Sequence, residues 1–367
     1  MKLFLPIILF CSMAPAEVKP IMQQFYSLTN KMRPFLINKA DFMDSKNEKE
    51  ISQALSEFVE NTKKLKKDKM AQDDDMKFRV QLLGEGLDMA EKSYKDGFKD
   101  YSFWVLKASL NNCFSCHTQK SLAGTDYTFN KDSQYDIYSK AEFLFIVRNY
   151  SEAMPLFEEI LVNYPKNKVS VENLESTAQK MLFYLMRVSY DDLKSIKLFE
   201  KILKNENLPV GLRSDFVAWK KYLNVKKYRI EQEKNISTPA ELEDFMNVRN
   251  QIADSYKLSN QRTIVDLDTT HFLYQLLEQT KAKELRPWVL YWLASVEKDY
   301  RLSMFDMSAE NYLKECIEKY STNKVAKKCF TAYKEMQTLA YTGSRGTDLP
   351  KSVVDQLNKY EALVNRK

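Results

Sequence analysis

The chain has few of the residues that turns and active sites need. Among its 367 residues there are only 7 Gly, 10 Pro and 2 His. So few glycines exclude the many tight turns of a β-sandwich, a propeller or a Rossmann crossover. No Ser-His-Asp arrangement is visible, and two histidines argue against a histidine-based active site. We therefore do not expect an enzyme.

The sequence also lacks a dominant charge and, after its first residues, any long apolar run. Its 56 basic and 50 acidic residues give a net charge of +6 and are interspersed. The densest basic run, 63–69, falls at an expected helix end, where it complements the helix dipole and does not mark a nucleic-acid track. No later segment approaches the ~20 apolar residues that span a bilayer, so we expect no transmembrane segment in the mature chain.

Helix-forming residues fill the long segments. Lys, Glu, Leu, Met and Ala recur throughout, and all five favour helices. At roughly 150 residues per domain, the length fits two or three domains. The composition therefore predicts an all-α protein.

Residues 1–16 have the pattern of a secretory signal peptide. Lys2 is followed by an apolar core from Leu3 to Cys11, and Ala14-Pro15-Ala16 supplies a small-x-small cleavage site. Cys11 also raises the alternative of a lipoprotein, but Phe10 is bulkier than the small residue expected before a lipidated cysteine. We expect an exported, periplasmic protein, with lipidation the less favoured route.

Four helical segments are expected within a first domain, 17–123. They run from Pro20 to Leu36, from Glu48 to Lys67, from the acidic start at 73–75 to Tyr94, and from Tyr101 to Cys116. Each of the first three carries an apolar stripe at helical spacing. Four helices with short connections predict an antiparallel bundle.

The motif Cys113-Phe-Ser-Cys116-His117 is the strongest chemical signal. Two thiols three residues apart suit addition to the two vinyl groups of a haem, and the adjacent histidine then ligates the iron. A thioredoxin-like pair would follow a strand in a βαβ unit, and none is expected here. A zinc site needs about four ligands, and no second pair lies nearby. The motif predicts one covalent haem c on Cys113 and Cys116, with His117 as the proximal ligand.

The position of this motif, at the end of a four-helix segment, resembles the class II cytochromes c, the cytochrome c-prime family. The segment Lys31-Met-Arg-Pro-Phe-Leu36 is similar to the one that ends that family's first helix. The resemblance covers about residues 18–120 and implies that Met22 occupies the distal position over the haem. Val18, where many members carry an arginine, and the short loop between the second and third helices depart from the family pattern.

Several groups compete to be the sixth iron ligand. A methionine at helical spacing also serves as core filler, so Met22, Met32, Met89 and an open site all stay possible. His271 would ligate only if the second domain folded over the haem; otherwise it is an ordinary helix residue.

After a polar linker at 124–134, residues 135–367 read as helix pairs. The first pair, ending at Pro165, resembles a tetratricopeptide repeat, with Ala141 and Ala153 at the small positions where two helices touch. Residues 172–209 form a more degenerate pair, and later pairs lose the small residues. An α-solenoid of such pairs is the prediction, with a single irregular helical domain as the alternative.

Cys316 and Cys329 remain. They lie near the facing ends of two expected helices, and an exported protein meets an oxidising compartment, so we predict a disulfide between them.

These observations predict an exported monohaem cytochrome that transfers electrons to or from a protein partner docked on its helical repeats. The alternative is a non-redox haem protein, either a gas sensor or an interaction scaffold. A methionine–iron bond favours the first, and an open iron favours the second.

Overall fold

A computed structural model describes the chain at residues 18–68, 74–119, 135–226, 236–279, 284–298, 308–344 and 346–365. These residues are almost entirely helical, which confirms the all-α prediction. One small hairpin interrupts the helices, where β1 (Thr342–Gly343) pairs antiparallel with β2 (Gly346–Thr347). The expected signal peptide, 1–16, and the expected linker, 124–134, lie outside the described residues.

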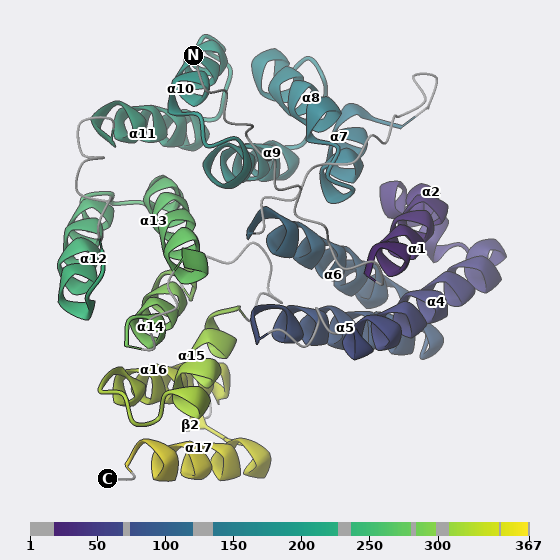
Figure 1. Cartoon of the computed structure of the whole chain (residues 1–367). Coiled ribbons are helices and arrows are strands. Elements are labelled where there is room, and N and C mark those ends of the chain that lie inside the picture. Colours follow the sequence, from purple (N-terminus) through teal and green to yellow (C-terminus); the bar gives the residue numbers. More distant parts are fainter. Residues whose placement is uncertain are drawn as a thin grey trace, which may run out of the picture. The chain divides into compact units, whose positions relative to one another are not determined.

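The chain divides into two compact units, Met1–Cys113 and Phe114–Lys367. In Figure 1 the helices of the N-terminal unit are purple and blue, and those of the C-terminal unit run from teal to yellow. Within the described residues, no helix combines the length and the apolar character that crossing a membrane requires.

Four long helices build the N-terminal unit: α1 (Val18–Lys31), α4 (Glu48–Lys67), α5 (Asp74–Lys95) and α6 (Lys99–Gln119), whose last turns extend past the unit boundary. Two short helices, α2 (Arg33–Ile37) and α3 (Lys39–Met43), and a single 3₁₀ turn (Ser45–Asn47) join α1 to α4. The four expected segments are therefore helical, although the first is divided. Pro34 has no N–H to continue the hydrogen-bond ladder, and α1 ends just before it.

The predicted apolar stripes form the core of this unit. Met22, in the first stripe, is only partly buried, whereas these other members are buried: Phe25, Leu28, Met32, Leu36, Ile51, Leu55, Phe58, Val59, Leu65, Leu82, Leu83, Leu87, Ala90 and Tyr94. Two glycines in α5 let its neighbours approach closely. A Cβ at Gly84 would lie 2.9 Å from Thr62 Cγ2 of α4, and one at Gly86 would lie 3.2 Å from Ser109 Cβ of α6.

The C-terminal unit is a succession of helices in chain order: α7 (Ile137–Ile146), α8 (Tyr150–Asn163), α9 (Val171–Tyr184), α10 (Asp192–Leu203), α11 (Val210–Lys226), α12 (Pro239–Asp254), α13 (Ser259–Gln279), α14 (Arg286–Glu297), α15 (Ser308–Lys319), α16 (Val325–Ala340) and α17 (Lys351–Val364). A π-helical turn, Leu185–Ser189, extends α9. Most of these helices contact the next helix in the chain, and several also contact the next but one, as α8 contacts α10 and α14 contacts α16.

The first helix pair packs as the small residues suggest. Ala141 of α7 and Ala153 of α8 are both fully buried, which lets the two helices approach. Residues 156–161 and 198–203 have similar sequences, and their matching phenylalanines, Phe157 of α8 and Phe199 of α10, are both fully buried. One core lies among α7–α11 and the start of α13, and a second lies among α12–α17.

Candidate functional site

The haem motif lies in the last turns of α6. This helix runs from Lys99 to Gln119 and carries Cys113, Cys116 and His117 without a break. The structure describes the helical backbone at these three residues, and their side chains lie outside its described part. Residues three and four apart share one side of a helix, so all three positions fall on the same face of α6.

That face continues a buried one. One to two turns before Cys113, α6 buries Leu106, Ser109 and Leu110, with exposed fractions of 0–2%. In the helical repeat, positions 113, 116 and 117 follow these buried residues along the same side of α6.

One end of the N-terminal unit is closed by α3. The Phe42 ring packs edge-on against Tyr94 and Phe103, with ring centroids 5.2 and 5.3 Å apart. The same end holds the ion pair between Lys99 Nζ and Glu48 Oε2, at 2.8 Å. It therefore contains the starts of α4 and α6 and the end of α5.

The opposite end, here called the motif end, holds the start of α1, the end of α4, the start of α5 and the last turns of α6. Ser102 of α6 donates to the Ala90 carbonyl of α5 at 2.7 Å, and Gly86 lies against Ser109, so the two helices are antiparallel. Gly84 lies against Thr62 near the end of α4. Helix α1 leads into α2 and α3, which lie toward the opposite end. It therefore begins at the motif end and runs away from it.

Met22 is in the second turn of α1, at the motif end, and its side chain is half-buried. Helix α1 begins at Val18, two residues before the expected start at Pro20. One turn further along, the Phe25 ring packs against Phe58 of α4 with ring centroids 6.0 Å apart. This contact places the first half of α1 against the C-terminal half of α4.

The other two methionines lie elsewhere. Met89 is 42% exposed, and its sulfur accepts a hydrogen bond from the Tyr101 hydroxyl at 3.2 Å. Tyr101 is twelve residues before Cys113, which is about 18 Å along the helix. Met32 is fully buried at the end of α1, away from the motif end. The geometry thus places Met22, but neither Met32 nor Met89, at the same end of the unit as the haem motif.

The residues around the motif end suit a haem, whose ring faces are apolar. Leu65 of α4, Val80 and Leu83 of α5 and Leu110 of α6 are all buried there, with exposed fractions of 2–7%. The close approach of Gly86 to Ser109 leaves no room for a ring between α5 and α6 at that level. If Cys113 and Cys116 held a haem, the apolar side chains of Leu65, Val80, Leu83 and Leu110 would suit its ring.

His271 belongs to α13 of the C-terminal unit and makes local contacts. Its imidazole stacks on the Tyr190 ring with centroids 3.9 Å apart and an interplanar angle of 20°. Its Nε2 lies 2.9 Å from Gln275 Nε2. Burial lowers the pKa of His271 to about 4, against a partial opposing effect of Asp268. The ring is therefore neutral at pH 7, and its stacking is that of an ordinary helix residue.

Next to His271 is a buried charge cluster that the sequence analysis did not foresee. The Asp268 side chain is fully buried and accepts contacts from Lys226 Nζ at 2.6 Å and Arg249 Nη1 at 2.9 Å. The Tyr222 and Tyr190 hydroxyls donate to the same carboxylate at 2.5 and 3.2 Å. Burial acts to raise the pKa of Asp268, but the two cations lower it below its usual value. This carboxylate is therefore ionised and ties α11, α12 and α13 together.

A second buried ion pair, between Arg187 and Glu297, contacts Thr270, the residue before His271 in the chain. Arg187 Nη2 is 3.3 Å from Glu297 Oε1 and donates to the Thr270 hydroxyl at 2.7 Å. The Tyr274 hydroxyl also donates to Glu297. Through these contacts the π-helical turn is joined to α13 and α14.

Cys316 and Cys329 are both fully buried, and their sulfur atoms are 2.09 Å apart, joined as a disulfide. The bond links α15 to α16, the helix hairpin in which the sequence analysis expected it. The Cα atoms are 6.3 Å apart, within the usual range for such a bond.

Comparisons of this chain with family models, with curated proteins and with solved structures found no match. The candidate site therefore rests on the chain's own residues.

Proposed function

We propose that the chain is an exported c-type cytochrome with one covalent haem, which exchanges electrons with a protein partner held by its C-terminal helices. The observation that carries this proposal is the position of the motif. Cys113, Cys116 and His117 lie in the last turns of α6, one to two turns after the buried residues Leu106, Ser109 and Leu110. A bound haem would supply a one-electron iron couple in these surroundings.

The chain's own residues have distinct roles in this proposal. A haem would be held by Cys113 and Cys116, whose thiols would form thioether bonds to its vinyl groups. His117 would supply an imidazole nitrogen as a ligand to its iron. Met22 would supply a thioether sulfur as a second ligand.

Two further features support the proposal of an exported protein with a repeat domain. The disulfide between Cys316 and Cys329 is typical of an oxidising compartment such as the periplasm. The helices of the C-terminal unit contact mainly their neighbours in the chain, the order expected for a stack of tetratricopeptide-like pairs. The concave surface of such a stack is suited to holding a partner.

Covalent attachment is tested by extracting haem from the denatured protein. After expression in a host that attaches haem c, the unmutated chain should keep its haem through acid–acetone extraction. Cys113→Ala with Cys116→Ala should lose all of it, whereas Cys316→Ser with Cys329→Ser, which changes the other cysteine pair, should keep it. Haem that extracts from the unmutated chain would contradict the proposal.

The sixth ligand is tested by Met22→Leu, with Met89→Leu as the matched control. The unmutated protein should be low-spin, with a weak sulfur-to-iron band in the near infrared. Met22→Leu should make it high-spin and speed its binding of carbon monoxide, while Met89→Leu should change neither property. If the unmutated protein is high-spin, the electron-transfer proposal is contradicted and the gas-binding alternative is favoured.

A further inference from the structure

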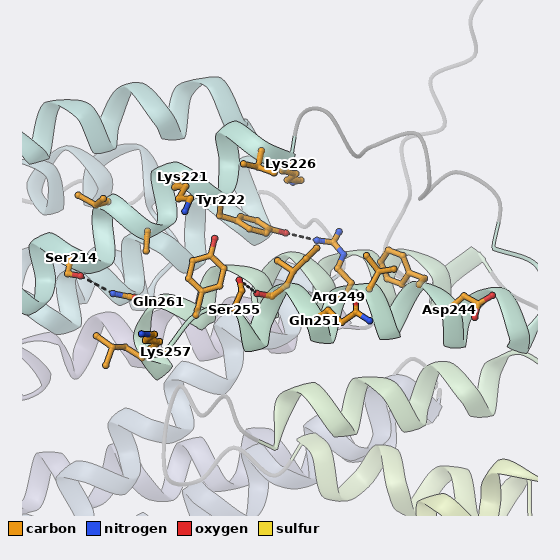
Figure 2. Close-up of a pocket in the computed structure, with 18 of the residues that line it drawn as sticks. Ser214, Lys221, Tyr222, Lys226, Asp244, Arg249, Gln251, Ser255, Lys257 and Gln261 are labelled. Atoms are coloured by element: carbon orange, nitrogen blue, oxygen red, sulfur yellow. Dashed lines mark hydrogen bonds between the residues drawn. The ribbon is translucent and has the colours of Figure 1, made fainter.

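In the C-terminal unit a groove lies between α11 and α12, closed at one side by the start of α13. It has a volume of about 1420 Å³. Figure 2 shows α11 along its upper wall and α12 along its lower one, with Ser214 and Gln261 at one end and Asp244 at the other. We call it the α11–α12 groove.

Its size favours a polypeptide over a small molecule. Pockets for small ligands are typically about 300–1,000 Å³, and this groove exceeds that range. The lining of α12 extends from Glu241 to Ser255, which is about 21 Å along the helix. A helix of about 14 residues spans that length.

The walls of the groove carry apolar side chains that nothing in the described structure covers. On α11, Val217 and Val225 are 52% and 41% exposed, and their spacing of eight puts them on one face. On the other side, Val248 and Leu258 are 43% and 52% exposed. Two facing apolar stripes are the complement of an amphipathic helix laid between them.

The floor of the groove is held in place before anything binds. Tyr222, Lys226 and Arg249 line it, and all three contact the buried Asp268 carboxylate. Arg249 also donates to the Tyr222 hydroxyl at 2.5 Å, the contact drawn as a dashed line in Figure 2. Because Asp268 already holds these side chains in place, the binding of a segment does not cost the conformational entropy of ordering them.

The charges that remain available are divided between the two halves of the groove. Lys221 and Lys257 lie in the half beside the end of α12, and Asp244 lies in the half beside its start. Within the described part of the chain these three residues have no charged partner, unlike Lys226 and Arg249. The first half therefore favours carboxylates, and the second favours a cation.

We infer that the α11–α12 groove binds an amphipathic helix of about 14 residues from the protein partner, with acidic residues at its Lys221–Lys257 end and a basic residue at its Asp244 end. This inference rests on the proposed function for the partner's role in electron transfer. The binding itself needs no haem.

The test is a selection of phage-displayed 14-residue peptides on the full-length protein, followed by measurement of the affinity of the enriched peptides by fluorescence anisotropy. Enriched peptides should have apolar residues three and four apart and Asp or Glu at one end. Lys221→Glu with Lys257→Glu should weaken their binding about tenfold or more, and peptides with Lys at that end should bind this variant instead. Lys197→Glu with Lys204→Glu, the same charge change at exposed positions in α10 and directly after it, should leave the affinity unchanged.

Val248→Asp, a substitution at a 43% exposed position, should abolish binding while the far-ultraviolet circular dichroism stays that of the unmutated protein. The inference is overturned if no peptide is enriched, or if the charge reversals leave the selected sequences and affinities unchanged. It is also overturned if the protein dimerises through the groove. Sedimentation would then give the mass of a dimer for the unmutated protein and that of a monomer for the charge-reversed variant. The haem content of each sample is read from its absorption spectrum. An unmutated protein that binds the peptides but carries no haem contradicts the proposed function alone. An unmutated protein that carries haem but binds no peptide contradicts this inference alone.

Discussion

The two units of this chain differ in how their polar groups are placed. In the N-terminal unit, ion pairs such as Lys31–Glu57 lie between exposed side chains, with exposed fractions of 37% and 43%. In the C-terminal unit, Asp268 and its two cations are 0–8% exposed, and Arg187–Glu297 is 4–6% exposed. The C-terminal unit therefore adds buried ion pairs and a disulfide to its apolar packing.

The difference indicates separate requirements. The N-terminal unit buries aliphatic side chains where we propose a haem, and an apolar surrounding is what a porphyrin ring needs. The C-terminal unit has helices in sequence order with little contact between distant ones. There the buried ion pairs and the disulfide add connections between helices besides their apolar packing. Lys226 and Arg249 also line the floor of the α11–α12 groove, so the network that joins these helices also shapes the site of the inferred binding.

The largest effect that sharpens this comparison is expected for Asp268→Ala. Removing the carboxylate leaves Lys226 and Arg249 buried without their counter-charge, which should lower the free energy of unfolding by about 3–5 kcal/mol. Hydrogen exchange followed by mass spectrometry should show faster exchange in α11–α13 and unchanged exchange in α4–α6. The matched control is Asp254→Ala, whose side chain is 73% exposed, with an expected change below about 0.5 kcal/mol. Equal loss of protection in both units would break the comparison.

A somewhat smaller effect is expected for Cys316→Ser with Cys329→Ser. The disulfide closes a loop with a sequence separation of 13, and its removal should cost about 3 kcal/mol, chiefly because the unfolded chain gains freedom. Denaturant unfolding of the variant, compared with the unmutated protein, measures this cost. The loss of protection should be greatest in α15 and α16. A variant as stable as the unmutated protein would mean that packing alone holds this hairpin.

His271→Phe should change the pH dependence of stability. The pKa of His271 is about 4 in the folded protein and about 6.5 in the unfolded chain, so the unfolded state binds more protons between these values. The contribution of His271 is therefore full above pH 6.5 and is lost as the pH falls toward 4. Phenylalanine keeps the stack on Tyr190 but has no proton to bind.

Between pH 7.5 and pH 5, the unmutated protein should lose about 1 kcal/mol more stability than the His271→Phe variant, a figure reduced for the partial exposure of the ring. Asp215 acts in the opposite sense, because burial raises its pKa to about 6 and favours folding at lower pH. Since Asp215 is present in both proteins, the difference between their denaturation curves isolates His271. Parallel curves would contradict the assignment.

The smallest effect is expected in the N-terminal unit. Lys31→Ala removes an ion pair of 3.9 Å between two exposed side chains and should change the free energy of unfolding by less than about 0.5 kcal/mol. Unfolding curves of the two proteins should nearly superimpose. A loss comparable to that of Asp268→Ala would show that exposed charges stabilise this unit as strongly as buried ones stabilise the other.

The sequence alone determined the local features of this protein. Apolar spacing predicted α4 and α5 with their buried stripes, because helical periodicity is a property of consecutive residues. Ala141 and Ala153 marked a close helix contact, because only small side chains allow one. The spacing of Cys113, Cys116 and His117 predicts a haem for the same reason, since the whole motif is local.

Only the tertiary structure decided which charges are buried. Arg187 and Glu297 are 110 residues apart, and Tyr222 is 46 residues from Asp268. From the sequence, Arg187, Glu297 and Asp268 would be placed on the solvent-facing side of an amphipathic helix, because charged side chains are normally exposed to water. Packing of α11, α12 and α13 brings opposite charges together, and their mutual attraction then compensates for lost hydration. The α11–α12 groove has the same origin, because its two walls belong to helices whose relative position no local pattern specifies.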